Sequence, residues 1–179
     1  PVAFVMNPMR WLQLISECDN VYTAAPNFAY DYVASMATPE KVAALDLSGL
    51  VGYLNGAEPI RAGTIRTFTE TFAPAGLRLE SSAPGYGLAE ATVFVATLGD
   101  EHEAPRILLV DRVRLAEGEL VECEPGTEHS TELVSCGTPF GQYVAIVDPD
   151  TALERPDGRV GEIWINGPNV ARGYWGKSE

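Results

Sequence analysis

The first hundred residues alternate between short apolar runs and stretches in which apolar residues recur at helical spacing. Ile60, Ile65, Phe68 and Phe72 fall on one face of a helix, which Pro74 then ends. Strands that alternate with helices predict a parallel or mixed sheet covered by helices. The expected strands span residues 21–24, 50–54 and 77–81, and the other expected helices begin at Asn7, Asn27 and Thr38, which are residue types that cap helix N-termini.

After Thr92 the pattern changes to short strand-like runs separated by turn residues such as Pro156-Asp157-Gly158. This pattern predicts a mostly antiparallel sheet in the second half. We therefore expect an α/β fold, with a helix-covered mixed sheet over residues 1–100 and a mostly antiparallel, β-rich subdomain over residues 101–179. The expected strands of the second part span residues 93–97, 106–110, 119–122, 132–136, 143–147 and 161–165.

The composition excludes several classes of protein. A hydrophobic content of 46% is typical of a folded domain rather than a disordered chain. A formal net charge of −13, with lysine only at positions 41 and 177, argues against nucleic-acid binding, which needs cations to neutralise phosphates. The three cysteines lack metal-ligand or CxxC spacing and are expected to be reduced thiols of a cytoplasmic protein. No apolar run reaches the length of a membrane span.

The most informative stretch is Tyr86-Gly87-Leu88-Ala89-Glu90-Ala91-Thr92, the 86–92 loop. Gly87 lets the backbone approach a ligand closely and adopt a positive φ, and a helix start after it would attract phosphate. Tyr86 offers a flat ring to a base, and Glu90 offers a hard oxygen ligand for Mg²⁺. The alternative is a loop-to-helix turn with the tyrosine in the core and the glutamate on the surface.

A second loop lies about thirty residues upstream, where the expected strand 50–54 runs into Asn55-Gly56-Ala57-Glu58-Pro59, the 55–59 loop. Ligands of open α/β sheets bind in the crevice beyond the carboxyl ends of the strands. The expected strand 77–81 leads into the 86–92 loop in the same way. We therefore expect the two loops to face one another across this crevice.

With both loops in view, the chain resembles the adenylate-forming (acyl-activating) superfamily, and within it most closely the fatty-acyl-AMP ligases. The order and spacing of four motifs carry the resemblance, which covers nearly the whole chain. It implies that residues 101–179 belong to the barrel-like subdomain of the family. The ligase branch is suggested by the 55–59 loop and by Ala89, where acyl-CoA synthetases usually carry threonine. The four motifs are Ala25-Pro26-Asn27-Phe28-Ala29-Tyr30, the 55–59 loop, the 86–92 loop, and Gly161-Glu162-Ile163-Trp164-Ile165 followed by Gly167-Pro168-Asn169-Val170-Ala171-Arg172-Gly173-Tyr174-Trp175.

The resemblance implies that ATP and Mg²⁺ are the cofactors. Tyr86 would stack on adenine, and Glu90 would hold the metal and act in catalysis. Ala89 removes a hydroxyl that relatives carry, and Thr92 is its possible replacement. Asn27, Phe28 and Tyr30 would wall the acyl pocket, although a core role on an amphipathic helix, with Phe28, Tyr32, Val33 and Met36 inward, is the alternative. The other implied nucleotide contacts are Asn55, Gly56, Ala57 and Glu58, together with the backbone around Gly87 and Leu88.

The resemblance also implies a reaction and partners. The parent enzyme would convert a fatty acid and ATP to an acyl-adenylate and pyrophosphate, and then pass the acyl group to the phosphopantetheine of a carrier protein, often in polyketide synthesis. The acidic stretch 115–132 aligns with an insertion typical of the fatty-acyl-AMP ligases, or is a solvated hairpin.

Some parts of the family pattern are absent. The phosphate loop, the ribose-binding Asp and the C-terminal domain with its catalytic Lys are missing, which predicts an internal piece of a larger enzyme, inactive alone. The alternatives are a piece of an acyl-CoA synthetase or a non-catalytic binding domain that retains the fold.

Overall fold

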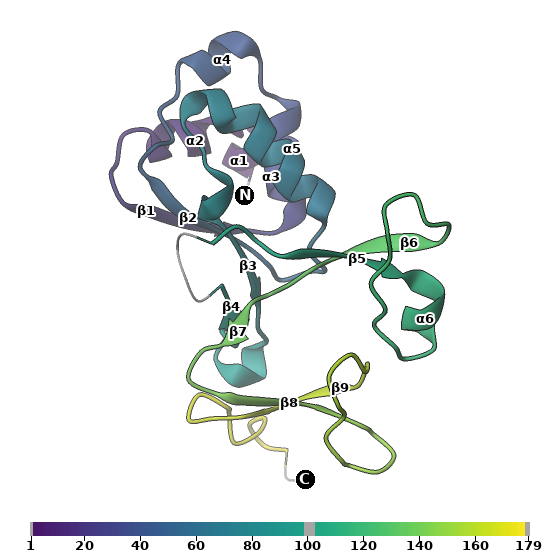
Figure 1. Cartoon of the computed structure of the whole chain (residues 1–179). Helices are drawn as coiled ribbons and strands as arrows, with labels where there is room; N and C mark the ends of the chain where they lie inside the picture. Colours follow the sequence, from purple (N-terminus) through teal and green to yellow (C-terminus); the bar gives the residue numbers. More distant parts are fainter. Residues whose placement is uncertain (1, 99–102, 178–179) are drawn as a thin grey trace.

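A computed structural model describes residues 2–98 and 103–177 of the chain. A sheet with helices packed on it forms one part, and two antiparallel hairpins extend from it (Figure 1). The expected boundary between residues 100 and 101 lies outside the described residues. Within the described ranges, no helix is both long and apolar enough to cross a membrane.

The elements follow one another in the alternating order expected for the first half. Three single 3₁₀ turns, η1 (Ala73–Ala75), η2 (Leu79–Ser81) and η3 (Ala89–Ala91), lie between the longer elements. The helices are α1 (Val2–Met6), α2 (Met9–Ile15), α3 (Asn27–Ser35), α4 (Pro39–Ala43), α5 (Ala62–Phe72) and α6 (Arg112–Ala116). The strands are β1 (Val21–Ala25), β2 (Leu50–Asn55), β3 (Ser82–Tyr86), β4 (Ala96–Thr97), β5 (Ile107–Asp111), β6 (Ser130–Val134), β7 (Thr138–Pro139), β8 (Tyr143–Val147) and β9 (Glu162–Asn166).

The main sheet is mixed, as predicted, with the strand order β1-β2-β3-β4-β7. β1, β2 and β3 are parallel, whereas β4 pairs antiparallel with both β3 and β7. β3 divides its length between two neighbours: Ser82 to Pro84 pair with β2, and Gly85 and Tyr86 pair with β4. β5 with β6 and β8 with β9 form the two separate antiparallel hairpins.

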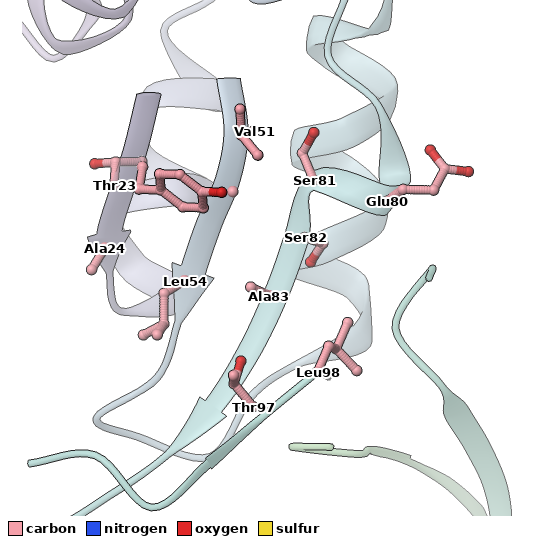
Figure 2. A pocket seen from close by; sticks show the side chains of 12 residues that line it. Thr23, Ala24, Val51, Leu54, Glu80, Ser81, Ser82, Ala83, Thr97 and Leu98 are labelled. Carbon is pink, nitrogen blue, oxygen red and sulfur yellow. The ribbon is translucent and has the colours of Figure 1, made fainter. Parts of the chain in front are cut away.

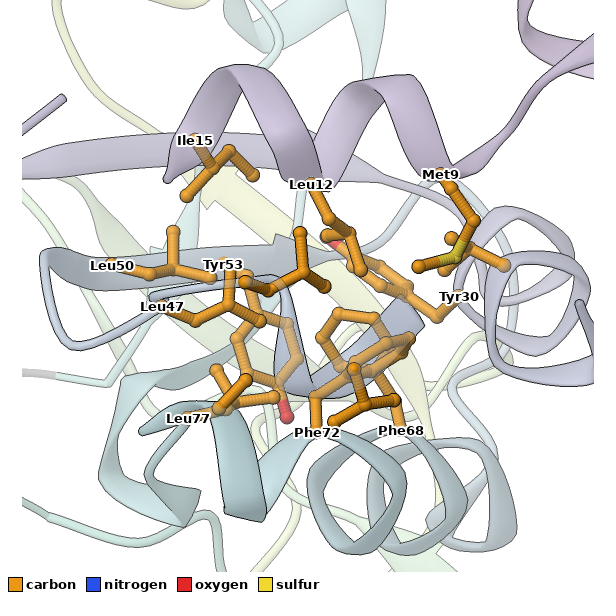
Figure 3. Close-up of a cluster of buried hydrophobic side chains, with 14 residues drawn as sticks. Met9, Leu12, Ile15, Tyr30, Leu47, Leu50, Tyr53, Phe68, Phe72 and Leu77 are labelled. Carbon is orange, nitrogen blue, oxygen red and sulfur yellow. The ribbon is translucent and has the colours of Figure 1, made fainter. Parts of the chain in front are cut away.

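One hydrophobic core holds the helices against the parallel strands (Figure 3). Tyr30 from α3, Tyr53 from β2 and Phe68 from α5 meet there, with ring centroids 4.9 to 5.2 Å apart. Val21 of β1 pairs with Leu50 and Tyr22 pairs with Gly52, so β2 has one extra residue at this point. Residues three apart on a regular strand face opposite sides, but this bulge lets Leu50 and Tyr53 both enter the core. The parallel strands are thus fixed from the helical side, which leaves their carboxyl ends available for a site.

An ion pair joins the hairpin β5–β6 to the helical layer. Arg66 of α5 donates two hydrogen bonds to the carboxylate of Glu132 on β6, at 2.9 and 2.7 Å. The hydrogen bonds hold the pKa of the Glu132 carboxyl below its usual range. This contact attaches residues from the expected acidic insertion to the main sheet domain.

Several predicted elements differ in the structure. Residues 77–81 are not a strand, because Ser81 ends the turn η2 and its hydroxyl bonds to the carbonyl of Leu50. The strand β3 begins at Ser82, directly after the expected range, and includes Tyr86. Of the expected strand 93–97 only Ala96 and Thr97 pair as β4, and residues 119–122 form only isolated bridges. The helices α1 and α6 were not predicted, although Asp111 caps α6 through its side chain.

The predicted caps at Asn7 and Asn27 are wrong, because no side-chain cap bond is present at the start of α2 or α3. Thr38 does cap α4, as expected. On α3, Val33 is buried as predicted, but Phe28 is exposed. Met36, which directly follows the helix, is also exposed rather than buried.

Candidate functional site

A pocket of about 330 Å³ lies at the carboxyl ends of the three parallel strands. Gly56 and Ala57, which follow β2, line one side, and Tyr86 and Gly87, at the end of β3, line another. The two loops that the sequence predicted to face one another therefore share a single cavity. The rest of the lining comes from Ala24, Ala25, Pro26, Leu54, Gly85, Val93 and Phe94.

Glycine is required in both loops because the backbone segments approach each other closely. A Cβ at Gly56 would lie 2.8 Å from the carbonyl oxygen of Gly85, and a Cβ at Gly87 would lie 1.5 Å from that of Val93. Gly87 does not have the positive φ that was expected of it. That conformation falls instead on Ala57, Thr92 and Val93.

Tyr86 connects the pocket to the strands beneath it. Its side chain is half-buried, lines the pocket and also packs against a small cluster that includes Ala91, Val95 and Ala96. Its carbonyl accepts a hydrogen bond from the backbone N–H of Val95 at 3.0 Å. The ring is therefore held in a fixed place, which suits a wall against which a flat ligand can lie.

Two asparagines that were candidate ligand contacts instead support the 55–59 loop from inside. Asn55 is the last residue of β2, is fully buried and donates from Nδ2 to Oδ1 of Asn27 at 3.0 Å. Asn27 donates to the carbonyl of Pro59 and accepts from the N–H of Arg61. These bonds fix the path of the loop, whereas the side chain of Glu58 is exposed.

Glu90 lies on the single turn η3, where a longer helix was expected. Its side chain is exposed and is outside the lining of the pocket, at the far end of the 86–92 loop. The hydroxyl of Tyr174 donates a hydrogen bond to its Oε1, and this bond holds the pKa of the Glu90 carboxyl below its usual range. Glu90 is therefore an ionised carboxylate at neutral pH.

The segment 169–174, from the last sequence motif, packs along the 86–92 loop. Asn169 donates from Nδ2 to the carbonyl of Ala91 at 2.7 Å, and its own carbonyl accepts a bond of 2.6 Å from the Thr92 hydroxyl. The Ala171 N–H donates to the carbonyl of Glu90 at 2.7 Å. Asn169 and Tyr174 were not among the predicted site residues, although the motif that contains them was recognised.

The described residues contain no group of three or more His, Cys, Asp or Glu side chains that could hold a metal ion. Glu90 is the one predicted metal ligand. A single exposed carboxylate does fit Mg²⁺, because this ion retains several waters and is commonly held by one or two carboxylates together with substrate phosphates.

An apolar groove of about 510 Å³ adjoins the pocket and shares Ala24, Ala25 and Pro26 with it. Phe28, at the start of α3, lines the groove together with Phe4 and Trp11. Of the three residues predicted to wall an acyl pocket, Phe28 alone contributes to this lining, because Asn27 and Tyr30 point into the protein.

Tyr30 is fully buried in the core, and its hydroxyl donates to the carbonyl of Leu54 at 2.7 Å. Burial raises the pKa of this phenol above its usual value, so the hydroxyl stays protonated and remains a donor. The structure thus gives Tyr30 the core role that was the alternative at the level of sequence.

Tyr30→Phe is expected to lower the free energy of unfolding by about 1–2 kcal/mol, because the buried carbonyl of Leu54 loses its donor. Urea denaturation measures the change. Tyr32→Phe on the same helix is the matched control, since its hydroxyl bonds to the Val5 carbonyl at an exposed position, and it should change stability by less than about 0.5 kcal/mol. Equal losses in the two variants would contradict the assignment of Tyr30 to the core.

A further hollow of about 450 Å³ lies over the same strands, nearer their amino ends (Figure 2). It shares Ala24 and Leu54 with the candidate pocket, and Val51 and Glu80 lie at its other end. It contains neither of the glycine loops, so we place the candidate site in the smaller pocket.

The fold and the pocket define an α/β protein with a candidate ligand site beyond the carboxyl ends of its parallel strands. The chain belongs to the AMP-binding enzyme family, which it matches over residues 2–175. It is 42% identical over 179 residues to the long-chain-fatty-acid–AMP ligase FadD26 of Mycobacterium marinum, and 43% identical to the putative fatty-acid–CoA ligase fadD25 of Mycobacterium tuberculosis. All of this chain is covered in both matches, but it spans only 30% of the length of each relative.

Solved structures agree with this assignment. The fatty acid AMP ligase from Legionella pneumophila superposes with a TM-score of 0.92 at 37% identity, over 99% of this chain and 31% of that one. A fatty acyl-adenylate ligase from the same species, solved in complex with acyl adenylate and pyrophosphate, gives a TM-score of 0.91 over the same shares. The α/β fold predicted from the sequence is thus confirmed as that of adenylate-forming enzymes.

Proposed function

We propose that this chain works as part of a longer fatty-acyl-AMP ligase that activates a fatty acid with ATP. The observation that carries the proposal is the single pocket shared by the 55–59 and 86–92 loops. A relative of similar fold was solved with acyl adenylate and pyrophosphate, the products of this reaction. The fatty acid carboxylate would attack the α-phosphorus of ATP, forming the acyl–phosphate bond as the bond to pyrophosphate breaks.

In this proposal the chain contributes positioning and charge stabilisation rather than a nucleophile. Adenine would lie against the Tyr86 ring, with the backbone of Gly56 and Ala57 along its edge. Backbone N–H groups near Gly87 and Leu88 would face the α-phosphate. Gly56 and Gly87 let these loops pack closely on neighbouring backbone, which would hold their backbone groups in place beside the ligand.

Glu90 is the residue that would hold Mg²⁺, since it is ionised, exposed and part of the 86–92 loop, whose Tyr86 and Gly87 line the pocket. When bound, the metal would neutralise charge on the phosphate oxygens. Thr92 cannot simply replace the hydroxyl that Ala89 lacks, because its Oγ1 already donates to the carbonyl of Asn169.

The groove lined by Phe28 is our proposed start of the acyl site, because it is apolar and continuous with the candidate nucleotide pocket. Phe28→Ala should raise the KM for long-chain acids about fivefold with little change in the KM for ATP, since roughly 1 kcal/mol of apolar contact is lost. Initial rates of pyrophosphate exchange with acids of increasing length measure this.

Met36→Ala is the control for that variant. Met36 is also exposed, directly follows the same helix and lies outside the groove lining. If Met36→Ala and Phe28→Ala shift the KM for acids equally, the groove does not bind the acyl chain.

The reaction itself is tested in the full-length protein by following fatty-acid-dependent exchange of labelled pyrophosphate into ATP. Exchange that requires a fatty acid supports the proposal, and its absence with acids of every length rejects it. The purified acyl-adenylate can then be offered to a carrier protein bearing phosphopantetheine or to free CoA.

We expect the acyl group to pass to the carrier protein, and we expect the enzyme to be cytoplasmic. Transfer to CoA is the second candidate, because a relative of comparable identity carries the name of a putative fatty-acid–CoA ligase. The acceptor that receives the acyl group decides between the two.

A further inference from the structure

Local backbone hydrogen bonds close the turn that carries Glu90: the N–H groups of Ala91 and Val93 donate to the carbonyl of Leu88, and that of Thr92 donates to the carbonyl of Ala89. These bonds do not involve the Glu90 side chain. η3 is a single 3₁₀ turn, and the two residues after it, Thr92 and Val93, both have positive φ values of 54° and 74°. Such backbone is uncommon for a threonine and strained for a valine. An exposed carboxylate on a turn of this kind would not by itself be held in one orientation.

Further support comes from the segment 169–174, about eighty residues later. Asn169 donates to the carbonyls of Ala91 and Phe94 at 2.7 and 3.2 Å, and Thr92 donates to the carbonyl of Asn169. Ala171 donates to the carbonyl of Glu90. The backbone groups that a longer helix would have satisfied are thus paired with a second segment of chain.

One contact in this set reaches the functional group itself. The Tyr174 hydroxyl donates a hydrogen bond to Oε1 of the Glu90 carboxylate. A hydroxyl donor to a carboxylate is a strong, directional bond. A second contact is made by the Tyr174 ring, because Lys177 Nζ lies over it at 5.9 Å from the ring centroid.

We propose that Tyr174 is a positioning residue that orients the Glu90 carboxylate for the divalent ion through the Tyr174–Oε1 hydrogen bond. The inference rests on the proposed function, because it assumes that Glu90 is a metal ligand. Hydrogen-bond partners of metal ligands fix the ligand's orientation, and their loss typically weakens metal affinity about 10- to 100-fold. Since Glu90 and Tyr174 are both exposed, we expect an effect at the lower end of this range.

The test compares Tyr174→Phe with Tyr143→Phe in the full-length protein. Tyr143 is a matched control: it is 62% exposed against 65% for Tyr174, and its hydroxyl also donates to a glutamate, Glu154, at 3.0 Å. Binding of Mn²⁺ is measured by electron paramagnetic resonance in the presence of a non-hydrolysable ATP analogue. Thermal unfolding of both variants shows whether either loses its fold.

Tyr174→Phe should weaken Mn²⁺ binding about tenfold and raise the Mg²⁺ concentration that half-saturates pyrophosphate exchange by a similar factor. Tyr143→Phe should change neither quantity. In a Glu90→Gln background, Tyr174→Phe should add nothing further, because the carboxylate that it orients is gone.

Wild-type Mn²⁺ affinity in Tyr174→Phe, alongside weakened binding in Glu90→Gln, would overturn the positioning role while leaving the proposed function intact. Wild-type affinity in Glu90→Gln would instead remove the metal role of Glu90, and with it the positioning role of Tyr174. An equal loss of affinity in Tyr143→Phe would show a general structural effect and also reject the inference.

Discussion

Glu90→Gln is expected to slow fatty-acid-dependent pyrophosphate exchange by about 10²- to 10³-fold, or roughly 3–4 kcal/mol of barrier. The amide has nearly the same shape but no charge, so it would hold the divalent ion poorly and leave the charge on the phosphates uncompensated. The measurement is the exchange rate of the full-length protein at saturating ATP and acid. Because the Glu90 side chain is exposed, its replacement should leave the fold intact.

Glu80→Gln is the matched control for this variant. Glu80 is another exposed carboxylate, in the turn η2 at the opposite end of β3 from the 86–92 loop. Its replacement should leave the exchange rate unchanged. An exchange rate in Glu90→Gln equal to that of the wild type would show that the reaction does not use this carboxylate.

Gly87→Ala is expected to abolish measurable ATP binding. The added Cβ would lie 1.5 Å from the carbonyl oxygen of Val93, which is backbone and cannot rotate away like a side chain. Either the 86–92 loop or residues 93–94 must move, and both line the candidate pocket. Displacing them should weaken nucleotide binding by more than about 100-fold, several kcal/mol, as overpacking in a closely fitted region does.

Calorimetric titration with ATP measures the effect, and Gly63→Ala provides the comparison. Gly63 lies in the first turn of α5, and a Cβ there would meet nothing within 4 Å. That substitution should stabilise the protein slightly, because alanine favours helix. Retained ATP binding in Gly87→Ala would mean that the nucleotide does not sit in the pocket next to Gly87.

The order of helices and strands in the first half could be predicted because burial imposes a period on each element. α5 shows this best: Ile65, Phe68 and Phe72 are buried on one face, as their spacing indicates. β8 also matches its expected range, since its strand pattern is bounded by clear turn residues.

Other elements could not be predicted because distant partners decide them. Ser81 belongs to a turn rather than a strand since its hydroxyl finds the carbonyl of Leu50, thirty-one residues away. Asn27 has the residue type of a helix cap, but its side chain is held by Asn55 and by the loop after β2. Local sequence cannot distinguish these bonds from a cap.

The same distinction applies to the site. The two glycine loops could be placed together because both follow parallel strands of one sheet, and those ends meet at one edge. The pairing of Glu90 with Tyr174 joins residues eighty-four positions apart, and no local pattern indicates it. Tyr30 and Phe28 are two positions apart on one helix, yet only the packing of α3 decides which enters the core.

The divided pairing of β3 has a mechanical consequence. Ser82 to Pro84 are bound to β2, and the next two residues are bound to β4. If the β4–β7 ribbon slid against the parallel strands, the displacement would fall around Pro84 and Gly85, where the pairing of β3 changes from one neighbour to the other. Tyr86 would travel with the ribbon, whereas Gly56 would remain with the parallel strands, so such a shear would widen or narrow the space between them.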